Sequence, residues 1–138
     1  MQTARDQLAQ AQTGAAVALV ARRADRLSAI EARIGKTGGR AVAIQADVLD
    51  RAQMAAAFDQ AEKAFGPVTI LVNNAGVILR EGMDSPNAHA VVRKVMDVNL
   101  FGVFNTIHAW LPALRATRGC IINISSGAAF LGQPRALG

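Results

Sequence analysis

Polar and cationic side chains recur in this sequence directly after runs of apolar residues. These groups are Arg22-Arg23, Asp47, Asn73-Asn74-Ala75-Gly76 and Ser125-Ser126. Guanidinium groups bind phosphate, carboxylates accept hydrogen bonds, and small residues let a flat ligand approach the backbone. If the apolar runs are parallel strands, these side chains meet at one edge of a sheet, where such folds bind their ligands. The pattern therefore predicts a ligand site built from strand ends.

The arginine pair follows the first apolar run. A dinucleotide-binding fold places an acidic residue near this position to hold the ribose 2′-hydroxyl. This chain instead has Ala21 followed by Arg22 and Arg23, which suit a 2′-phosphate dianion. The alternative interpretation is a solvated arginine pair that opens a helix.

Two further groups are compatible with a nucleotide. Asp47, with Val48 beside it, can accept a hydrogen bond from an adenine amino group, or can simply form a turn. Asn73 can bridge strands through its amide, and Ala75 and Gly76 allow close approach to the backbone. The alternative for this second group is a polar turn.

Asn99 lies inside a long predicted helix. A mid-helix asparagine is mildly unfavourable and often bonds to backbone, so it is either a helix defect that holds a water or an ordinary polar surface residue. Ser126, preceded by Ser125, follows the last apolar run. Its hydroxyl can polarise a substrate carbonyl or cap a turn.

The remaining side chains that could be reactive are predicted to have structural roles. The Gly35-Lys36-Thr37 segment lacks the spacing and the strand–loop–helix order of a phosphate-binding loop. His89 and His108 have unrelated spacing and are predicted to be surface or packing residues. Cys120 is predicted to be a small buried hydrophobe, and Trp110 a packing residue or part of a partner surface.

Hydrophobic periodicity predicts the elements that must position these residues. Asp50 is a suitable N-cap, and the last helix is expected to bend or break near Gly102 or Pro112. The predicted strands cover residues 15–21, 41–45, 68–72 and 120–124, and the predicted helices cover residues 3–12, 24–34, 51–65 and 88–114. This alternation predicts βαβ units, and hence an α/β fold with a parallel sheet covered on both faces.

The composition argues against several classes of protein. The chain has 138 residues, enough for one domain, and its net charge of +5 comes mainly from scattered arginines, so no nucleic-acid partner is expected. A single cysteine and two histidines indicate neither a disulfide framework nor a metal site. Because no apolar run can span a bilayer and no targeting core opens the chain, no membrane contact and a cytoplasmic setting are expected.

Taken in order, three motifs resemble those of the short-chain dehydrogenase/reductase family. They are Asn73-Asn74-Ala75-Gly76, Val98-Asn99-Leu100-Phe101-Gly102 and Ile122-Asn123-Ile124-Ser125-Ser126. The resemblance implies a Rossmann-like three-layer fold, with residues 1–138 forming a partial dinucleotide-binding domain. It also implies hydride transfer between a nicotinamide cofactor and an alcohol/carbonyl pair.

The resemblance also implies a set of cofactor-binding residues. Arg22, helped by Arg23, is the ligand of the 2′-phosphate, and Asp47 faces the adenine with Val48 beside it. The residues expected to lie against the cofactor after the third strand are Asn73, Ala75 and Gly76. Because Ala21 stands where NAD-preferring members often carry Asp, NADP is favoured over NAD.

By the same resemblance, the catalytic residues are Ser126, which binds the carbonyl oxygen, and Asn99, which holds a water in the proton relay. The family's Tyr-x-x-x-Lys segment would begin just past Gly138, and the chain has no tyrosine and no lysine after Lys94. We therefore expect this chain alone to be inactive, because a serine hydroxyl cannot replace the tyrosine as general acid/base. The full-length parent would be the oxidoreductase.

The fold is accordingly expected to be incomplete. The glycine-rich turn and first strand that should precede the helix at 3–12 are missing, as are the C-terminal strands. In the family the first strand lies between the strands at 15–21 and 68–72, so its loss either leaves unpaired edges or forces these two to pair.

A non-catalytic function is the alternative. The helix at 88–114 can form a homo-oligomer through apolar side chains, for which the candidates are Val91, Val95, Leu100, Phe104 and Trp110.

Overall fold

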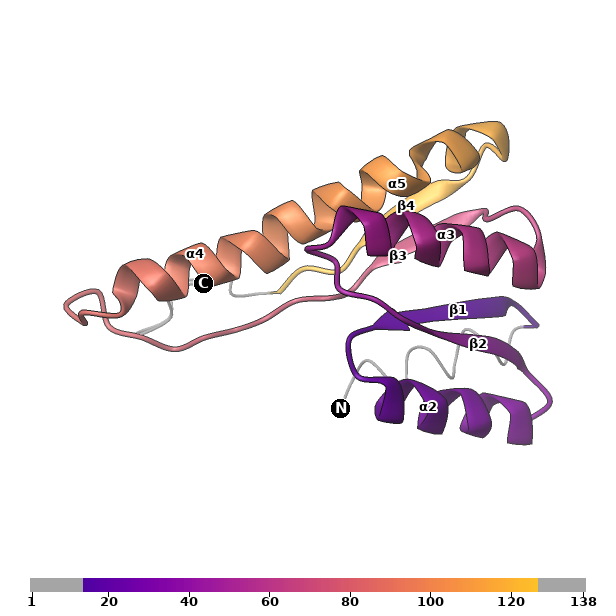
Figure 1. Cartoon of the computed structure of the whole chain (residues 1–138), viewed down its shortest axis with the longest axis horizontal. Helices are drawn as coiled ribbons and strands as arrows, with labels where there is room; N and C mark the ends of the chain where they lie inside the picture. The colour runs from indigo at the N-terminus through magenta and orange to yellow at the C-terminus, as the bar shows by residue number, and fades with distance from the viewer. Residues whose placement is uncertain (1–13, 127–138) are drawn as a thin grey trace.

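The computed structural model describes residues 14–126 (Figure 1). Its elements are β1 (Ala16–Ala21), α2 (Ala24–Lys36), β2 (Arg40–Gln45), α3 (Arg51–Phe65), β3 (Ile70–Asn73), α4 (Ala88–Met96), the π-helical segment η1 (Asp97–Gly102), α5 (Val103–Ala116) and β4 (Cys120–Asn123). The predicted alternation of strands and helices is confirmed, with small shifts at the element ends. The helix predicted at residues 3–12 lies outside the described residues.

The first sheet is a three-layer unit. β1 and β2 pair in parallel, with Ala21 opposite Gln45, while α2 packs on one side of the pair and α3 on the other. The side chains buried between β1 and α2 are Leu19, Leu27 and Ile34. The Glu31 side chain of α2 accepts the backbone N–H of Ala43 at 3.1 Å, so a helix side chain pairs a strand donor of β2. This unit therefore has the two covered faces that the sequence predicts.

Among the described residues, the second sheet is covered on one face. β3 and β4 pair in parallel, and Leu71 is buried on the face where α5 packs. On the opposite face Ile70, Cys120 and Ile122 are exposed. The prediction that Cys120 is a buried hydrophobe is wrong, because it assumed a sheet covered on both sides.

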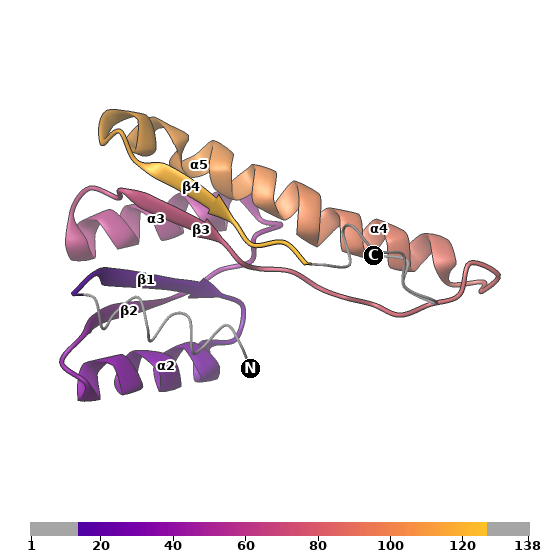
Figure 2. The same cartoon turned by 180° about the vertical axis from the view of Figure 1, so that it is seen from behind.

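The described strands form two separate two-stranded sheets. β1 and β3 point the same way, but no backbone ladder joins them (Figure 2). Of the two expected outcomes for these strands, direct pairing is not found, and within residues 14–126 each keeps an unpaired edge.

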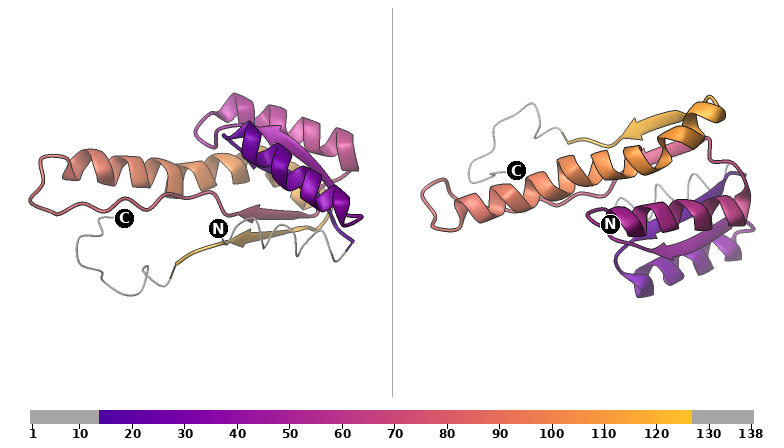
Figure 3. Two further views of the ribbon diagram at one scale, coloured as in Figure 1. Left: turned by 90° about the horizontal axis from the view of Figure 1, so that it is seen from below. Right: turned by 45° about the horizontal axis from the view of Figure 1, so that its top comes forward.

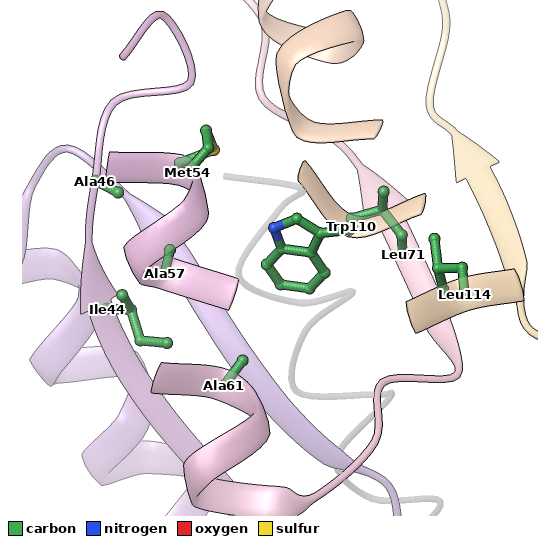
Figure 4. Close-up of a cluster of buried hydrophobic side chains, with 8 residues drawn as sticks. All are labelled: Ile44, Ala46, Met54, Ala57, Ala61, Leu71, Trp110 and Leu114. Carbon is green, nitrogen blue, oxygen red and sulfur yellow. The ribbon is translucent and has the colours of Figure 1, made fainter. Parts of the chain in front are cut away.

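A shared core holds the two sheets together (Figure 4). Its buried members come from β2, α3, β3, α5 and the residue after β2, and are Ile44, Ala46, Met54, Ala57, Ala61, Leu71, Trp110 and Leu114. Trp110 is 5% exposed and meets the Phe58 ring edge-on, with 5.6 Å between the ring centroids. The predicted packing role of Trp110 is therefore confirmed.

One helical rod runs from α4 through η1 into α5 and carries α4 away from the sheets (Figure 3). The sequence predicts a bend or break near Gly102 or Pro112, but the helix is continuous at both positions, and a π-helical segment ends at Gly102. Pro112 lies inside α5 without interrupting it. Within residues 14–126, no helix has the length and hydropathy needed to cross a bilayer.

Candidate functional site

The carboxyl ends of the described strands point to one side of the molecule (Figure 2). Gln45 ends β2 opposite Ala21 of β1, and Asn123 ends β4 opposite Asn73 of β3. The predicted site residues on loops follow these ends in the chain. The two sheets therefore present their polar turns on a common side, as parallel strands require.

The turn after β1 has a fixed backbone and exposed cations. The Gln45 amide donates to the backbone carbonyl of Arg22 at 3.0 Å, and the Ala46 N–H donates to the carbonyl of Ala21 at 3.1 Å. Arg22 and Arg23 are exposed, and neither guanidinium pairs with a carboxylate of residues 14–126. Both charges are available to an anion outside the chain.

The turn after β2 is held by local hydrogen bonds. Asp47 Oδ1 accepts the N–H of Leu49 at 3.0 Å, and the N–H of Asp47 donates to Gln53 Oε1 at 2.9 Å. The bond from Leu49 forms a turn, which is the alternative role predicted for Asp47, and it occupies one oxygen of the carboxylate. Asp47 and Leu49 also line a shallow depression beside the first turn of α3.

Asp50 caps α3 as predicted. Its Oδ1 accepts the N–H groups of Ala52 and Gln53 at 2.9 and 3.0 Å, and its Oδ2 accepts from the Gln53 side chain at 2.8 Å. The backbone N–H of Gln53, with these other donors, lowers the pKa of Asp50 below its ordinary value of 3.8. The cap fixes the start of α3 at Arg51, and so fixes where the turn that begins at Asp47 ends.

The turn after β3 begins with a buried asparagine. Asn73 Nδ2 donates to Asn123 Oδ1 at 2.9 Å, so this amide bridges β3 and β4 in the way that its residue type allows. Ala75 and Gly76 follow and are exposed. The contact of these three residues with a cofactor stays a prediction.

Asn99 lies in the π-helical segment and reaches the same turn. Its Oδ1 accepts the N–H of Val77 at 2.8 Å, and its Nδ2 donates to the carbonyl of Val77 at 2.9 Å. A Cβ at Gly76 would lie 3.3 Å from Asn99 Oδ1, so glycine permits this close approach. Asn99 is therefore part of a helix irregularity rather than an ordinary polar surface residue. Its catalytic role and its water stay predictions.

Ser126 lies just beyond β4, at the end of the described residues, and is exposed together with Ser125. The N–H of Ile124 donates to the carbonyl of Asn73 at 2.9 Å, so the strand ladder extends one step towards the serines. This places Ser126 on the same side as the Asn73 turn. Its catalytic role stays a prediction.

Sequence reasoning missed the amides that hold these turns. Gln45 fixes Arg22, Gln53 fixes Asp47, and Asn105 of α5 donates to the carbonyl of Val48 at 3.0 Å. The signal for these residues is an amide side chain at a strand end or in the first turn of a helix, which lies outside the segments that directly follow the strands.

Comparison with known proteins places this arrangement in a family. The family model described as short chain dehydrogenase matches residues 6–137. The chain belongs to the short-chain dehydrogenase family. An uncharacterized oxidoreductase of Mycobacterium tuberculosis is 39% identical over 111 residues, which are 79% of this chain and 39% of that protein. The family membership and the Rossmann-like α/β fold expected from the motifs are thus confirmed.

Solved short-chain dehydrogenase structures agree. A short-chain type dehydrogenase/reductase from Mycobacterium marinum superposes with a TM-score of 0.87 at 31% identity, covering 96% of this chain and 54% of that one. A 7α-hydroxysteroid dehydrogenase in complex with NADH and 7-oxo glycochenodeoxycholic acid gives 0.86 at 29% identity, covering 96% and 52%. The chain spans roughly half or less of the length of these relatives.

The residues at the strand ends fit one half of the nicotinamide cofactor that binds to short-chain dehydrogenases. Exposed guanidiniums at Arg22 and Arg23 suit a phosphate, and the Asp47 turn offers an acceptor to an adenine amino group. No glycine-rich turn precedes a helix within residues 14–126, so the described residues provide no such cradle for the pyrophosphate. The fit is therefore to the adenosine end.

Proposed function

We propose that this chain is part of a cytoplasmic, NADP(H)-dependent oxidoreductase that acts on a small alcohol or carbonyl compound. The observation that carries the proposal is the exposed Arg22-Arg23 pair at the carboxyl end of β1. The backbone of Arg22 is anchored by Gln45, so a guanidinium can meet a 2′-phosphate with little ordering of the chain.

In the proposed complex each turn has its own task. Arg22 and Arg23 hold the 2′-phosphate, Asp47 and Val48 hold the adenine, and the third turn lies along the rest of the cofactor. The residues of that third turn are Asn73, Ala75 and Gly76. NADPH supplies the hydride when bound.

The catalytic residues act on the substrate side. Ser126 donates a hydrogen bond to the carbonyl oxygen, while Asn99 holds the loop at Val77 and orders a water for the proton relay. A general acid must still deliver a proton to the carbonyl oxygen, and this sequence has no tyrosine. We therefore propose that the purified chain does not turn over. Measurable NADPH-dependent reduction of simple carbonyls by the 138-residue chain would overturn that proposal.

The cofactor preference is tested by titration of the chain with NADP and with NAD. We expect NADP to bind at least about tenfold more tightly, because a charged hydrogen bond to the 2′-phosphate contributes roughly 1.5–3 kcal/mol. Arg22→Ala should reduce this difference strongly, and Arg26→Ala, a change of an exposed arginine on α2 that is not assigned to the cofactor, should leave it intact. Equal or absent binding of both dinucleotides to the unaltered chain would contradict the assignment.

A second candidate function is self-association through the helical rod. Val92, Met96, Leu100 and Phe104 recur at helical spacing and are exposed, and a depression beside them has Arg93 and Asp97 in its lining. Charges of both signs at one place suit pairing with a second copy of this chain in the antiparallel sense.

The candidate contacts for this surface need revision. Val95 and Trp110 are each 5% exposed, so they pack within the protein and cannot contact a partner, whereas Leu100 and Phe104 are exposed. Light scattering at several concentrations tests the idea. A mass that stays monomeric at every concentration would contradict it. Phe104→Asp should lower the fraction of dimer, and with it the average mass that light scattering measures.

A further inference from the structure

Two residues of the helical rod contact the turn after β2. Asn105 Nδ2 donates to the backbone carbonyl of Val48 at 3.0 Å in a partly buried position. One turn earlier, Gly102 is buried, and a Cβ there would lie 2.7 Å from Val48 Cγ2. The backbone and the side chain of Val48 are thus both fixed by a short stretch of one helix.

The same turn is also held by a side chain of α3. Gln53 Oε1 accepts the N–H of Asp47, and Asp47 Oδ1 accepts the N–H of Leu49. Asp47 Oδ2 has no hydrogen-bond partner among the described residues. The turn is therefore immobilised while one carboxylate oxygen stays available to an external donor.

The π-helical segment connects the turn after β2 to the turn after β3, which Asn99 contacts at Val77. Asn99 binds the backbone of Val77, whereas Gly102 and Asn105 hold Val48 a little further along the same rod. An α-helix presents residues three and four positions apart on one face, and the wider π-helical turn alters that phase. One rod thereby reaches the loops after β2 and β3.

We propose that Asn105 and Gly102 form a positioning pair that holds Asp47 and Val48 in the geometry that accepts an adenine ring, and so set the affinity for the adenosine half of the cofactor. This inference rests on the proposed function. Asn105 acts through Val48 and does not touch the ligand. A preformed loop binds more tightly because its ordering is complete before the ligand arrives.

The test uses the whole chain and two probes, adenosine 2′,5′-bisphosphate and adenosine 5′-monophosphate. Asn105→Leu removes the donor to Val48 at similar volume, and we expect the affinity for both probes to fall about tenfold. The ratio between the two affinities should not change, because it reports on Arg22. Gly102→Ala should have a similar effect, even though alanine raises helix propensity, since its Cβ displaces Val48.

A readout without nucleotide separates positioning from binding. Amide hydrogen exchange at Asp47 and Leu49 should accelerate about tenfold in Asn105→Leu, because the turn that protects these N–H groups loosens. The matched control is Thr106→Val, which removes a hydroxyl that bonds to Met54 and to the carbonyl of Gly102. It should leave the exchange of the turn and both affinities unchanged.

The outcomes separate the two proposals. Unaltered affinity and exchange in Asn105→Leu, or equal changes in Thr106→Val, would overturn the positioning role while the proposed function stands. Failure of the unaltered chain to bind either adenosine probe would overturn the proposed function, and the adenine role of the turn with it.

Discussion

The two sheets of this protein differ in how their strands are held. The β1–β2 unit lies between α2 and α3, and Leu19 and Ile34 within it are fully buried. The β3–β4 unit is covered by α5 on one face and exposes Ile70 and Ile122 on the other. Apolar packing on both faces orders the strands of the first unit, whereas the strands of the second unit have one packed face and the amide cross-link Asn73–Asn123.

The comparison teaches that similar strands can support a site in two ways. A doubly covered pair has a closed core that orders its strands by apolar burial. A singly covered pair has fewer such contacts, and polar cross-links between its strands and the neighbouring helix carry more of the local order. The predictions below test this division, beginning with the core that the units share.

Trp110 connects the units, so its loss should have the largest effect. Trp110→Ala leaves a large cavity between α3 and β3, and we expect the free energy of unfolding to fall by about 3–5 kcal/mol. Chemical denaturation of the chain measures this change. Phe104→Ala is the control, since the Phe104 ring is exposed and its removal should change stability by less than about 0.5 kcal/mol.

Paired truncations test the difference in burial directly. Leu19→Ala should destabilise the chain by about 2–5 kcal/mol, because the side chain is fully buried between β1 and α2. Ile122→Ala should change stability by less than about 0.5 kcal/mol, because the side chain lies on the exposed face of β4. Equal losses for the two variants, measured by the same denaturation, would remove the distinction between the units.

The amide bridge of the second unit should have a smaller effect. Asn73→Ala deletes the bond to Asn123, whose oxygen can turn to water, so we expect a loss of about 1 kcal/mol. Exchange of the Ile124 amide, which donates to the carbonyl of Asn73, should accelerate with it. Unchanged exchange at Ile124 would show that the bridge does not order the segment before Ser126.

The smallest effect concerns the cap of α3 and depends on pH. The pKa of Asp50 is lower in the folded chain than its ordinary value of 3.8, chiefly through the N–H of Gln53, so the carboxylate stabilises the fold above that value. This stability is lost as the pH falls through the lowered pKa. Thermal melts of Asp50→Asn, which keeps a capping side chain without the charge, should show a weaker dependence below pH 3.8.

Local signals predicted much of this architecture. The bounds of α3 and its Asp50 cap follow from residues adjacent in sequence, whereas the bend or break predicted near Gly102 is instead a π-helical segment in a continuous helix. The exposure of Cys120 could not be predicted, because it depends on whether a helix covers the far face of β4. The same limit applies to Asn105 and Gln45, whose partners are distant in the chain and become neighbours only after folding.

The π-helical turn also sets a rotational phase between the two ends of the rod. Each residue of an α-helix advances the chain by about 100°, and a π-helical turn absorbs an extra residue. Val95 before the turn and Trp110 after it are both buried, so each end is anchored in its own direction. Deleting one residue from the π-helical segment would return it to α-helical geometry with little change of phase, whereas deleting one residue from α5 before Trp110 would turn that anchor out of the interior by roughly 100°. Chain length in the regular part of the rod is therefore more tightly constrained than the identity of the exposed residues along it.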